Sequence, residues 1–291
     1  MKPFGVVAPD TVEEAVEALG RYGESARVIA GGTALALLMR QGLYRPKALI
    51  NLNGVQGLHG IRGEADGGVF IGPLTPHREI ERDPLLAERF PALAGMARHV
   101  ANPQVRNVGT IGGNLCHADP ASDPPTALIA AGAEVAVLGP AGARDLAVED
   151  LSRGYYETCL GPDEVLTGIR LPAPEPRSGM AYLRYTTTTE EDRPFVCVGV
   201  RLKVGDDGRR CEDARVAVGA AGPAPVRAIG AEEALRGEDL SGELLAAAAE
   251  RAVEGIDPID DVRGPASYRL EMVKVFFRRA ASAAWTSARE A

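Results

Sequence analysis

The first fifty residues alternate between helical spacing of apolar side chains and short apolar runs typical of strands. Apolar residues at helical spacing predict a helix over Thr11–Leu19, with Asp10 and Glu13 as its capping pair. Three elements follow: a strand at Arg27–Ala30, a helix at Ala34–Arg40 and a strand at Ala48–Leu52. They form a compact strand–loop–helix–strand unit.

Short apolar runs and proline positions organise the middle of the chain. Pro124 and Pro125 stand where prolines are tolerated, at the start of a helix that we expect to run to Ala131. The other predicted elements are strands at Leu58–Ile61, Val69–Ile71, Glu134–Leu138 and Asp163–Leu171, and one helix from about Leu85 to Val100.

A proline-rich stretch then divides the chain. The three prolines within Pro172–Gly179 predict an extended spacer and a domain boundary. After the spacer come strands at Tyr182–Thr186, Val196–Val204 and Ala214–Ala220, and helices at Ala231–Leu235, Leu240–Val253 and Ala266–Trp285. Strands followed by a run of helices indicate an α+β fold.

The composition excludes several classes of function. A chain of 291 residues predicts about two domains, and 45% hydrophobic with 25% charged residues is typical of a globular protein. The net charge of −8 argues against nucleic-acid binding, which needs basic patches. No run of about 18 apolar residues occurs, so we expect no membrane span.

The four cysteines are dispersed. Cys116, Cys159, Cys197 and Cys211 include no C-x-x-C pair, which excludes the usual zinc and iron–sulfur patterns. Reduced thiols are typical of the cytosol, and Met1–Gly5 lacks the regions of a signal peptide. We therefore expect a cytoplasmic protein.

Two glycine doublets are the most informative pattern in the chain. Ala30–Leu35 reads Ala-Gly-Gly-Thr-Ala-Leu, and Thr110–Asn114 reads Thr-Ile-Gly-Gly-Asn. Glycine lets a backbone approach a ligand closely, and exposed N–H groups can form a nest for an anion. Two such segments indicate one elongated anionic ligand, such as a dinucleotide. A tight turn is the alternative for either doublet alone.

The standard phosphate-binding motifs do not occur. The sequence contains no G-x-G-x-x-G and no G-x-x-x-x-G-K-[ST], so it supports neither a Rossmann nor a P-loop site. The first doublet still follows a predicted strand and precedes a predicted helix, a geometry that directs N–H groups toward a phosphate.

Polar residues continue beyond the second doublet. Thr110 offers a hydroxyl beside the glycines, and Asn114 offers an amide that can fix the segment or a ligand. Ser122 and Asp123 stand at the mouth of the Pro124 helix. Asp123 is either the N-cap of that helix or an acceptor for ribose or ring N–H groups.

Three charged clusters have simpler explanations. His117 with Asp119 lacks a third ligand and a nearby cysteine pair, so we expect no metal site. Glu190–Asp192 is typical of a solvated turn. Asp260–Arg263 and Tyr268–Arg269 read as interface or helix-start residues, with local salt bridging as the simpler alternative.

The two glycine segments and their surroundings resemble one family. Ala30–Thr33 and Thr110–Asn114 closely resemble the two FAD-binding loops of molybdenum hydroxylase flavoprotein subunits. That family includes the medium subunit of carbon monoxide dehydrogenase and the FAD portion of xanthine dehydrogenase. The similarity continues at Ala118–Pro125, Val216–Gly219, Pro223, Pro225–Arg227, Asp261–Arg263 and Tyr268–Arg269.

The resemblance implies an α+β fold with two domains. The first is a two-part FAD-binding module, vanillyl-alcohol-oxidase-like (PCMH-type), over residues 1–174, with subparts of about 1–55 and 56–174. The second is a smaller flavoprotein C-terminal domain of strands plus helices over residues 179–288.

The resemblance also implies a site for noncovalent FAD. The pyrophosphate would lie between the glycine segments, with Thr33 and Asn114 bonding nearby. Asp123 would match a carboxylate near the ribityl or adenosine part, and Leu166 an apolar residue beside the flavin ring. The implied cofactor-binding residues are Ile29, Ala30, Gly31, Gly32, Thr33, Ala34, Leu35, Thr110, Ile111, Gly112, Gly113, Asn114, His117, Ser122, Asp123 and Leu166.

One segment departs from the family pattern. Thr186–Arg193 replaces the commoner lysine- or arginine-glycine-aspartate pattern, which leaves the neighbour of the flavin ring in this segment open.

By the same resemblance, the chain is one subunit of a larger oxidoreductase. A molybdopterin-binding large subunit would oxidise the substrate, and a [2Fe–2S] small subunit would pass electrons to this FAD, in a heterotrimer whose further dimerisation is open. The chain itself would carry no catalytic residue and no metal. The substrate and the acceptor (NAD, a quinone or oxygen) stay open.

Two other functions remain alternatives. A stand-alone flavin oxidoreductase of the same fold would oxidise a small organic substrate without partners. A nucleotide-binding assembly module would bind nucleotide without the absorption spectrum of a flavin.

Overall fold

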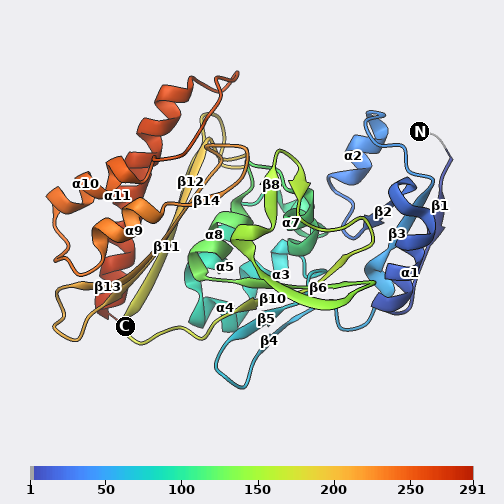
Figure 1. Ribbon diagram of the computed structural model, residues 1–291, viewed down its shortest axis with the longest axis horizontal. Helices are drawn as coiled ribbons and strands as arrows, with labels where there is room; N and C mark the ends of the chain where they lie inside the picture. Colours follow the sequence, from blue (N-terminus) through green and yellow to red (C-terminus); the bar gives the residue numbers. More distant parts are fainter. Residues whose placement is uncertain (1–2, 291) are drawn as a thin grey trace.

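The computed structural model describes residues 3–290 and arranges them as three parts in a row (Figure 1). The N-terminal part is a parallel sheet in the order β1-β3-β2. Its elements are β1 (Gly5–Val7), α1 (Val12–Tyr22), β2 (Ala26–Ile29), α2 (Leu35–Arg40) and β3 (Ala48–Asn51), with 3₁₀ turns at Gly23–Ser25 and Leu52–Gly54. The predicted strand–loop–helix–strand unit is confirmed.

Helix α1 is confirmed, but its ends differ from the prediction. Thr11 is the N-cap, because its hydroxyl oxygen accepts the N–H of Glu14 at 3.2 Å, and the Glu14 carboxylate accepts the N–H of Asp10 at 2.8 Å. The capping pair of Asp10 and Glu13 is therefore wrong by one residue. The helix also continues past Leu19 to Tyr22.

The middle part is an antiparallel sheet in the order β4-β5-β10-β6-β7. Its strands are β4 (Ile61–Gly63), β5 (Val69–Ile71), β6 (Glu134–Gly139), β7 (Gly142–Ala147) and β10 (Val165–Leu171), with a hairpin of β8 (Ser152–Gly154) and β9 (Glu157–Thr158) and a 3₁₀ turn at Val148–Asp150. Its helices are α3 (His77–Arg82), α4 (Pro84–Arg89), α5 (Pro91–Ala97), α6 (Pro103–Arg106), α7 (Ile111–His117) and α8 (Asp123–Ala131).

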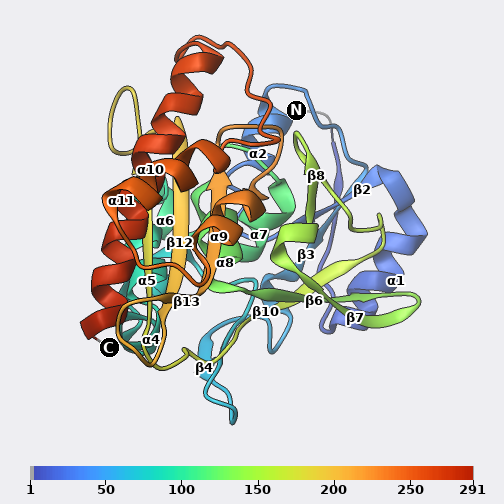
Figure 2. The ribbon, with the colours of Figure 1, turned by 60° about the vertical axis from the view of Figure 1, so that its left-hand side comes forward.

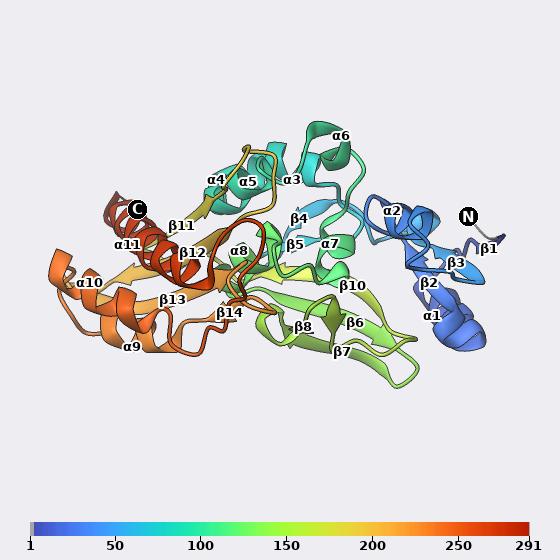
Figure 3. The same ribbon diagram turned by 90° about the horizontal axis from the view of Figure 1, so that it is seen from above.

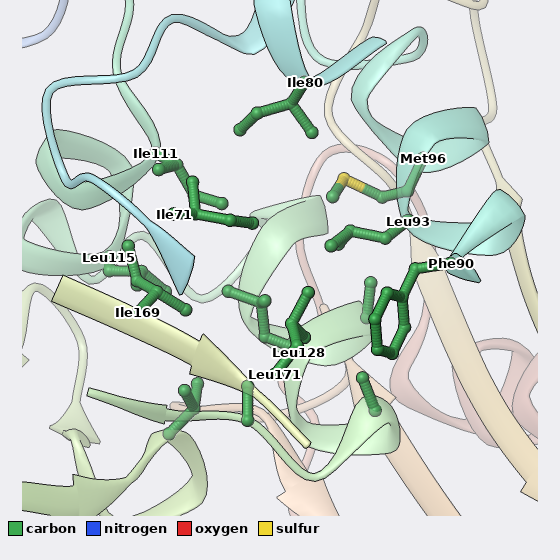
Figure 4. Close-up of a cluster of buried hydrophobic side chains, with 14 of the residues drawn as sticks. Ile71, Ile80, Phe90, Leu93, Met96, Ile111, Leu115, Leu128, Ile169 and Leu171 are labelled. Carbon is green, nitrogen blue, oxygen red and sulfur yellow. The ribbon is translucent and has the colours of Figure 1, made fainter. Parts of the chain in front are cut away.

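Apolar side chains fill the space between this sheet and its helices (Figure 4). Ile71 and Ile169 of the sheet, Leu93 and Met96 of α5, and Leu128 of α8 are all fully buried. Helix α8 is buried along its whole length, and Asp123 and Thr126 are the polar residues in its otherwise apolar sequence.

Three predictions for the middle part need correction. The single helix expected from Leu85 to Val100 is two helices, because Pro91 has no N–H and Phe90 is not helical (φ −135°, ψ 58°). The strand expected at Leu58–Ile61 begins only at Ile61. The sequence pattern misses β7, because most of its residues are exposed and it lacks an apolar face.

The C-terminal part is an antiparallel sheet in the order β11-β12-β13-β14, followed by helices. Its elements are β11 (Ser178–Tyr185), β12 (Val196–Val204), β13 (Cys211–Gly219), β14 (Val226–Arg227), α9 (Ile229–Leu235), α10 (Gly242–Arg251) and α11 (Ala266–Glu290). Strands followed by helices, and hence the α+β fold, are confirmed. The predicted spacer is shorter, because β11 begins at Ser178.

Glycines let a helix pack closely on each face of this sheet (Figure 2). A Cβ on Gly179 would lie 2.8 Å from the backbone of Ser287, on the face covered by α11. A Cβ on Gly199 would lie 2.7 Å from the Cβ of Ala130, on the face covered by α8. Helix α8 therefore joins the middle part to the C-terminal part.

Ion pairs and one hydrogen bond reinforce this junction. Glu149, in the middle part, pairs with Arg215 and, at 3.3 Å, with Arg227. Arg215 also donates to the carbonyl of Ile129 at the end of α8, at 2.6 Å. Within residues 3–290, no helix has the length and apolar character needed to cross a bilayer.

Candidate functional site

A cavity of about 1050 Å³ lies between the N-terminal and middle parts and reaches the C-terminal part. Figure 3 shows α2 and α7, which border it from the two sides, next to each other. The predicted site residues that line the cavity are Ile29, Ala30, Gly31, Gly32, Thr33, Ala34, Leu35, Thr110, Gly112, Gly113, Asn114, His117, Ser122, Asp123 and Leu166.

The first glycine segment has free backbone N–H groups. Strand β2 ends at Ile29 and α2 begins at Leu35, and within residues 3–290 no N–H from Gly31 to Leu35 donates to a protein acceptor. Gly32 has a positive φ of 69°, a conformation that favours glycine. The structure therefore places unbonded N–H groups where the sequence predicts an anion site, and anion binding there stays a prediction.

The second glycine segment uses its N–H groups internally. The Ile111 N–H donates to the Thr75 carbonyl at 3.1 Å, and the Gly112 N–H to the Pro73 carbonyl at 2.9 Å. The Gly113 N–H donates to the Thr110 hydroxyl at 3.2 Å. Instead of a loop, the segment is the first turn of α7 with Thr110 as N-cap, so the expectation of a second N–H nest is wrong.

Close backbone approach explains a glycine in each segment. A Cβ on Gly31 would lie 2.7 Å from the carbonyl carbon of Val108 and would overlap its oxygen. A Cβ on Gly112 would lie 2.8 Å from the Pro73 oxygen and would overlap the Pro73 side chain. Gly31 therefore brings the first segment against the stretch before Thr110, and Gly112 packs α7 against residues 73–75.

A short hydrogen bond orients the Asn114 side chain. The Ser122 hydroxyl donates to Asn114 Oδ1 at 2.6 Å. Within residues 3–290, Asn114 Nδ2 has no protein acceptor, and both residues line the cavity. The second segment therefore offers the cavity a side-chain donor in place of backbone N–H groups.

Asp123 connects the cavity to the C-terminal part. Its Oδ1 accepts the Tyr182 hydroxyl at 2.6 Å and lies 3.3 Å from Arg184 Nε. The residue is 5% exposed, and burial raises the pKa of its carboxyl to about 6, against the opposing effects of Arg184 and Tyr182. Ser122 occupies the N-cap position of α8, so the N-cap alternative for Asp123 is wrong.

An ion pair on the cavity wall links the middle part to the segment between β11 and β12. Arg193 lies 2.8 Å from Asp119, which also accepts the Ala121 N–H at 3.0 Å. The His117 ring packs against Tyr156 with 5.2 Å between centroids, and burial lowers the pKa of His117. Within residues 3–290, no cluster of three metal-ligating side chains occurs.

The cavity wall is mainly acidic among its charged residues. Its carboxylates are Glu24, Asp119, Asp123, Glu157, Glu164, Glu191 and Asp192, and its arginines are Arg27 and Arg193. Because carboxylates repel an anion, the free N–H groups of the first segment and the guanidinium of Arg27 are favourable contacts for one, whereas Arg193 is paired with Asp119.

Two predicted residues lie differently from the rest. Ile111 is fully buried in the hydrophobic core and does not line the cavity. Leu166 is 5% exposed at a β-bulge of β10 and borders both the core and the cavity.

The sequence pattern does not identify three further wall residues. His77, Tyr156 and Arg193 reach the cavity only through the fold. His77 is 2% exposed, and burial, with a smaller effect of Arg106, lowers its pKa to about 4. Of these three residues, only Arg193 has a signal in the sequence, because it ends the polar run that begins at Thr186.

Two models of known protein families match most of the chain. Residues 2–174 match the model of the FAD binding domain in molybdopterin dehydrogenase, and residues 181–284 match the CO dehydrogenase flavoprotein C-terminal domain. The chain belongs to the FAD-binding medium subunits of the molybdenum hydroxylase family. Its cofactor is FAD, and it is the flavoprotein component of an oxidoreductase.

Relatives match this medium subunit over nearly their full length. The carbon monoxide dehydrogenase medium chain of Hydrogenophaga pseudoflava is 35% identical, with 97% of both chains covered. The nicotine 6-hydroxylase medium subunit of Paenarthrobacter nicotinovorans is also 35% identical, with 94% of both covered.

Solved structures agree in fold. A structure of carbon monoxide dehydrogenase from Hydrogenophaga pseudoflava has a TM-score of 0.94 at 36% identity, with 99% of each chain covered. Quinoline 2-oxidoreductase from Pseudomonas putida 86 has a TM-score of 0.91 at 32% identity, covering 99% of this chain and 100% of that chain.

Proposed function

We propose that this medium subunit binds FAD noncovalently in the cavity and passes electrons from [2Fe–2S] clusters of a partner to an external acceptor. The bound flavin would supply the redox chemistry, and the residues of the chain would bind and orient it. The observation that carries the proposal is the row of free N–H groups from Gly31 to Leu35 on the cavity wall.

These N–H groups fit the pyrophosphate of FAD. They come from consecutive residues on a wall otherwise rich in carboxylates, so together with Arg27 they would favour an anion there. Thr33 would add a hydroxyl beside them. The Nδ2 of Asn114, held by Ser122, would donate from the opposite wall.

Asp123 and Leu166 would contact the remainder of FAD. The carboxylate of Asp123 would accept hydrogen bonds from sugar hydroxyls or ring N–H groups, and Leu166 would pack beside the flavin ring. Ile111 would act indirectly, by anchoring α7 in the core.

A subunit role is favoured over a stand-alone oxidoreductase. Two relatives that cover nearly the whole chain are named as a medium chain and a medium subunit, and a third, which covers 99% of it, as subunit alpha of a dehydrogenase complex. We therefore propose a molybdopterin-binding large subunit and a [2Fe–2S] small subunit as partners, and a cytoplasmic location. We also propose domain boundaries at residues 1–174 and 179–288.

The purified protein tests the cofactor first. We expect a yellow protein that releases FAD on denaturation and, as apoprotein, takes up one FAD per chain, measured by absorption and fluorescence titration. A colourless protein that takes up no FAD would overturn the proposal.

The electron-transfer role needs the partners. We expect substrate added to the assembled complex to bleach the flavin absorption, and the isolated chain to leave the same substrate untouched. Oxidation of substrate by the isolated chain would favour the stand-alone alternative.

A further inference from the structure

Strand β11 presents two polar side chains to Asp123, a residue of the cavity wall. Tyr182 and Arg184 are two residues apart on a strand and therefore project from the same face. Tyr182 pairs in register with Gly199, whose missing side chain leaves room for α8 on that face. The face that carries Tyr182 and Arg184 therefore lies against α8.

Both side chains converge on one oxygen. The Tyr182 hydroxyl donates to Asp123 Oδ1 at 2.6 Å, and Arg184 Nε lies 3.3 Å from the same atom. Within residues 3–290, Oδ2 of Asp123 accepts no side-chain hydrogen bond. One oxygen of Asp123 is thus held by the C-terminal part, and the other remains an acceptor on a residue that lines the cavity.

We propose that Tyr182 is a positioning residue for FAD, which fixes the Asp123 carboxylate so that its second oxygen faces the cofactor. This inference rests on the proposed function, in which Asp123 accepts hydrogen bonds from FAD. It also gives the C-terminal part a role in the site besides covering it.

The surroundings of Asp123 suit this role. The titratable and charged groups that face it are Tyr182 and Arg184 of β11 and Cys197 of β12. The thiol of Cys197 donates to the Thr126 hydroxyl at 3.4 Å, and burial raises its pKa to about 12, so it stays neutral. Burial also raises the pKa of Tyr182 well above its ordinary value, so its hydroxyl remains a donor.

Arg184 has other attachments, which make Tyr182 the cleaner test. Its guanidinium also donates to the His99 carbonyl at 2.6 Å and to the Asp192 carbonyl. Removing Arg184 would release several segments, whereas Tyr182→Phe removes a single oxygen atom.

The experiment is a fluorescence titration of apoprotein with FAD from pH 5 to pH 8. Because a buried hydrogen bond to a charged group is lost, we expect Tyr182→Phe to raise the FAD Kd about tenfold at pH 7.5. Without this donor the Asp123 carboxylate binds a proton more readily, so affinity should start to fall at a higher pH than in the wild type. Tyr185→Phe is the matched control on the opposite face, where the hydroxyls of Tyr185 and Tyr268 are 3.1 Å apart. We expect it to change neither quantity more than twofold.

Asp123→Asn provides the second arm. If Tyr182 acts through Asp123, Tyr182→Phe should change the Kd of the Asp123→Asn protein less than threefold. An unchanged Kd and pH profile for Tyr182→Phe, or an equal tenfold loss in the Asp123→Asn background, would overturn the inference. Wild-type apoprotein that takes up no FAD would instead refute the proposed function.

Discussion

The two glycine segments look alike in sequence and differ in what they offer a ligand. From Gly31 to Leu35 the N–H groups have no acceptor within residues 3–290. At Gly112 and Gly113 the N–H groups are bonded to Pro73 and Thr110. Within residues 3–290, the first segment is therefore a row of unbonded backbone N–H groups on the cavity wall, and the second is a packed helix start that presents side chains to the cavity.

This difference shows that a glycine doublet has two separate uses. In both segments a glycine permits close approach, of Gly31 to Val108 and of Gly112 to Pro73. Only the first segment follows directly on a strand, β2, and within residues 3–290 its N–H groups from Gly31 to Leu35 donate to no protein acceptor. The neighbours of the doublet thus decide whether its N–H groups are bonded within the protein or left without an acceptor there.

Gly31→Ala is the strongest test of the comparison. Because the new Cβ would overlap the Val108 carbonyl, the segment must shift, and its N–H groups would no longer converge on one anion. We expect FAD binding to weaken by at least about a hundredfold, or about 3 kcal/mol, in fluorescence titration. Gly20→Ala, in a helix with open space around it, is the control and should bind FAD like the wild type.

Gly112→Ala tests the structural use of the second doublet. Its Cβ would collide with Pro73, against which α7 packs, so we expect a loss of about 3 kcal/mol in the free energy of unfolding. Urea denaturation of the apoprotein measures it. A variant as stable as the wild type, with FAD binding abolished, would reverse the roles assigned to the two segments.

Asp123, at the start of α8 beyond the second glycine segment, makes the stability of the protein depend on pH with the opposite sign to most carboxylates. Burial raises its pKa to about 6, so the native state holds a proton that the unfolded state releases above its ordinary pKa near 4. The stability contributed by this residue is present at low pH and is lost as pH rises through about 6. Between pH 4 and 7 we expect the Asp123→Asn apoprotein to gain about 2 kcal/mol relative to the wild type. Urea denaturation at the two pH values measures this, and a constant difference would contradict it.

Thr110→Ala should have the smallest effect. The variant loses the N-cap bond to the Gly113 N–H, which is worth about 1 kcal/mol of unfolding free energy. Because this N–H is not aimed at the ligand, we expect the FAD Kd to change less than threefold. A large loss of FAD affinity with unchanged stability would show that the hydroxyl of Thr110 itself contacts FAD.

Much of the fold follows from local pattern. The strand before the first doublet, β5 and β12 all agree with the apolar runs in the sequence. Local pattern also held a signal that the helix prediction did not use, since Pro91 divides one apolar periodic stretch into α4 and α5. It misses β7, whose exposed residues pair only because β6 lies beside them.

The candidate site shows the same limit. The doublets and the run to Asp123 mark the wall residues, but glycine has low helix propensity, so the sequence favours a loop at Gly112. The helix forms there because residues 73–75 supply carbonyl acceptors and Thr110 supplies a cap. No local signal reveals that Tyr182, far along the chain, bonds to Asp123.

The sequence by itself determined the family and the cofactor, through the resemblance that its two glycine segments and their continuations carry, and it marked most of the segments that line the cavity. Only the tertiary structure decided which N–H groups are free and which oxygen of Asp123 is held. Hydrogen-bond partners from distant segments settle both, and burial, which raises the pKa of Asp123, exists only once α8 packs against the C-terminal sheet.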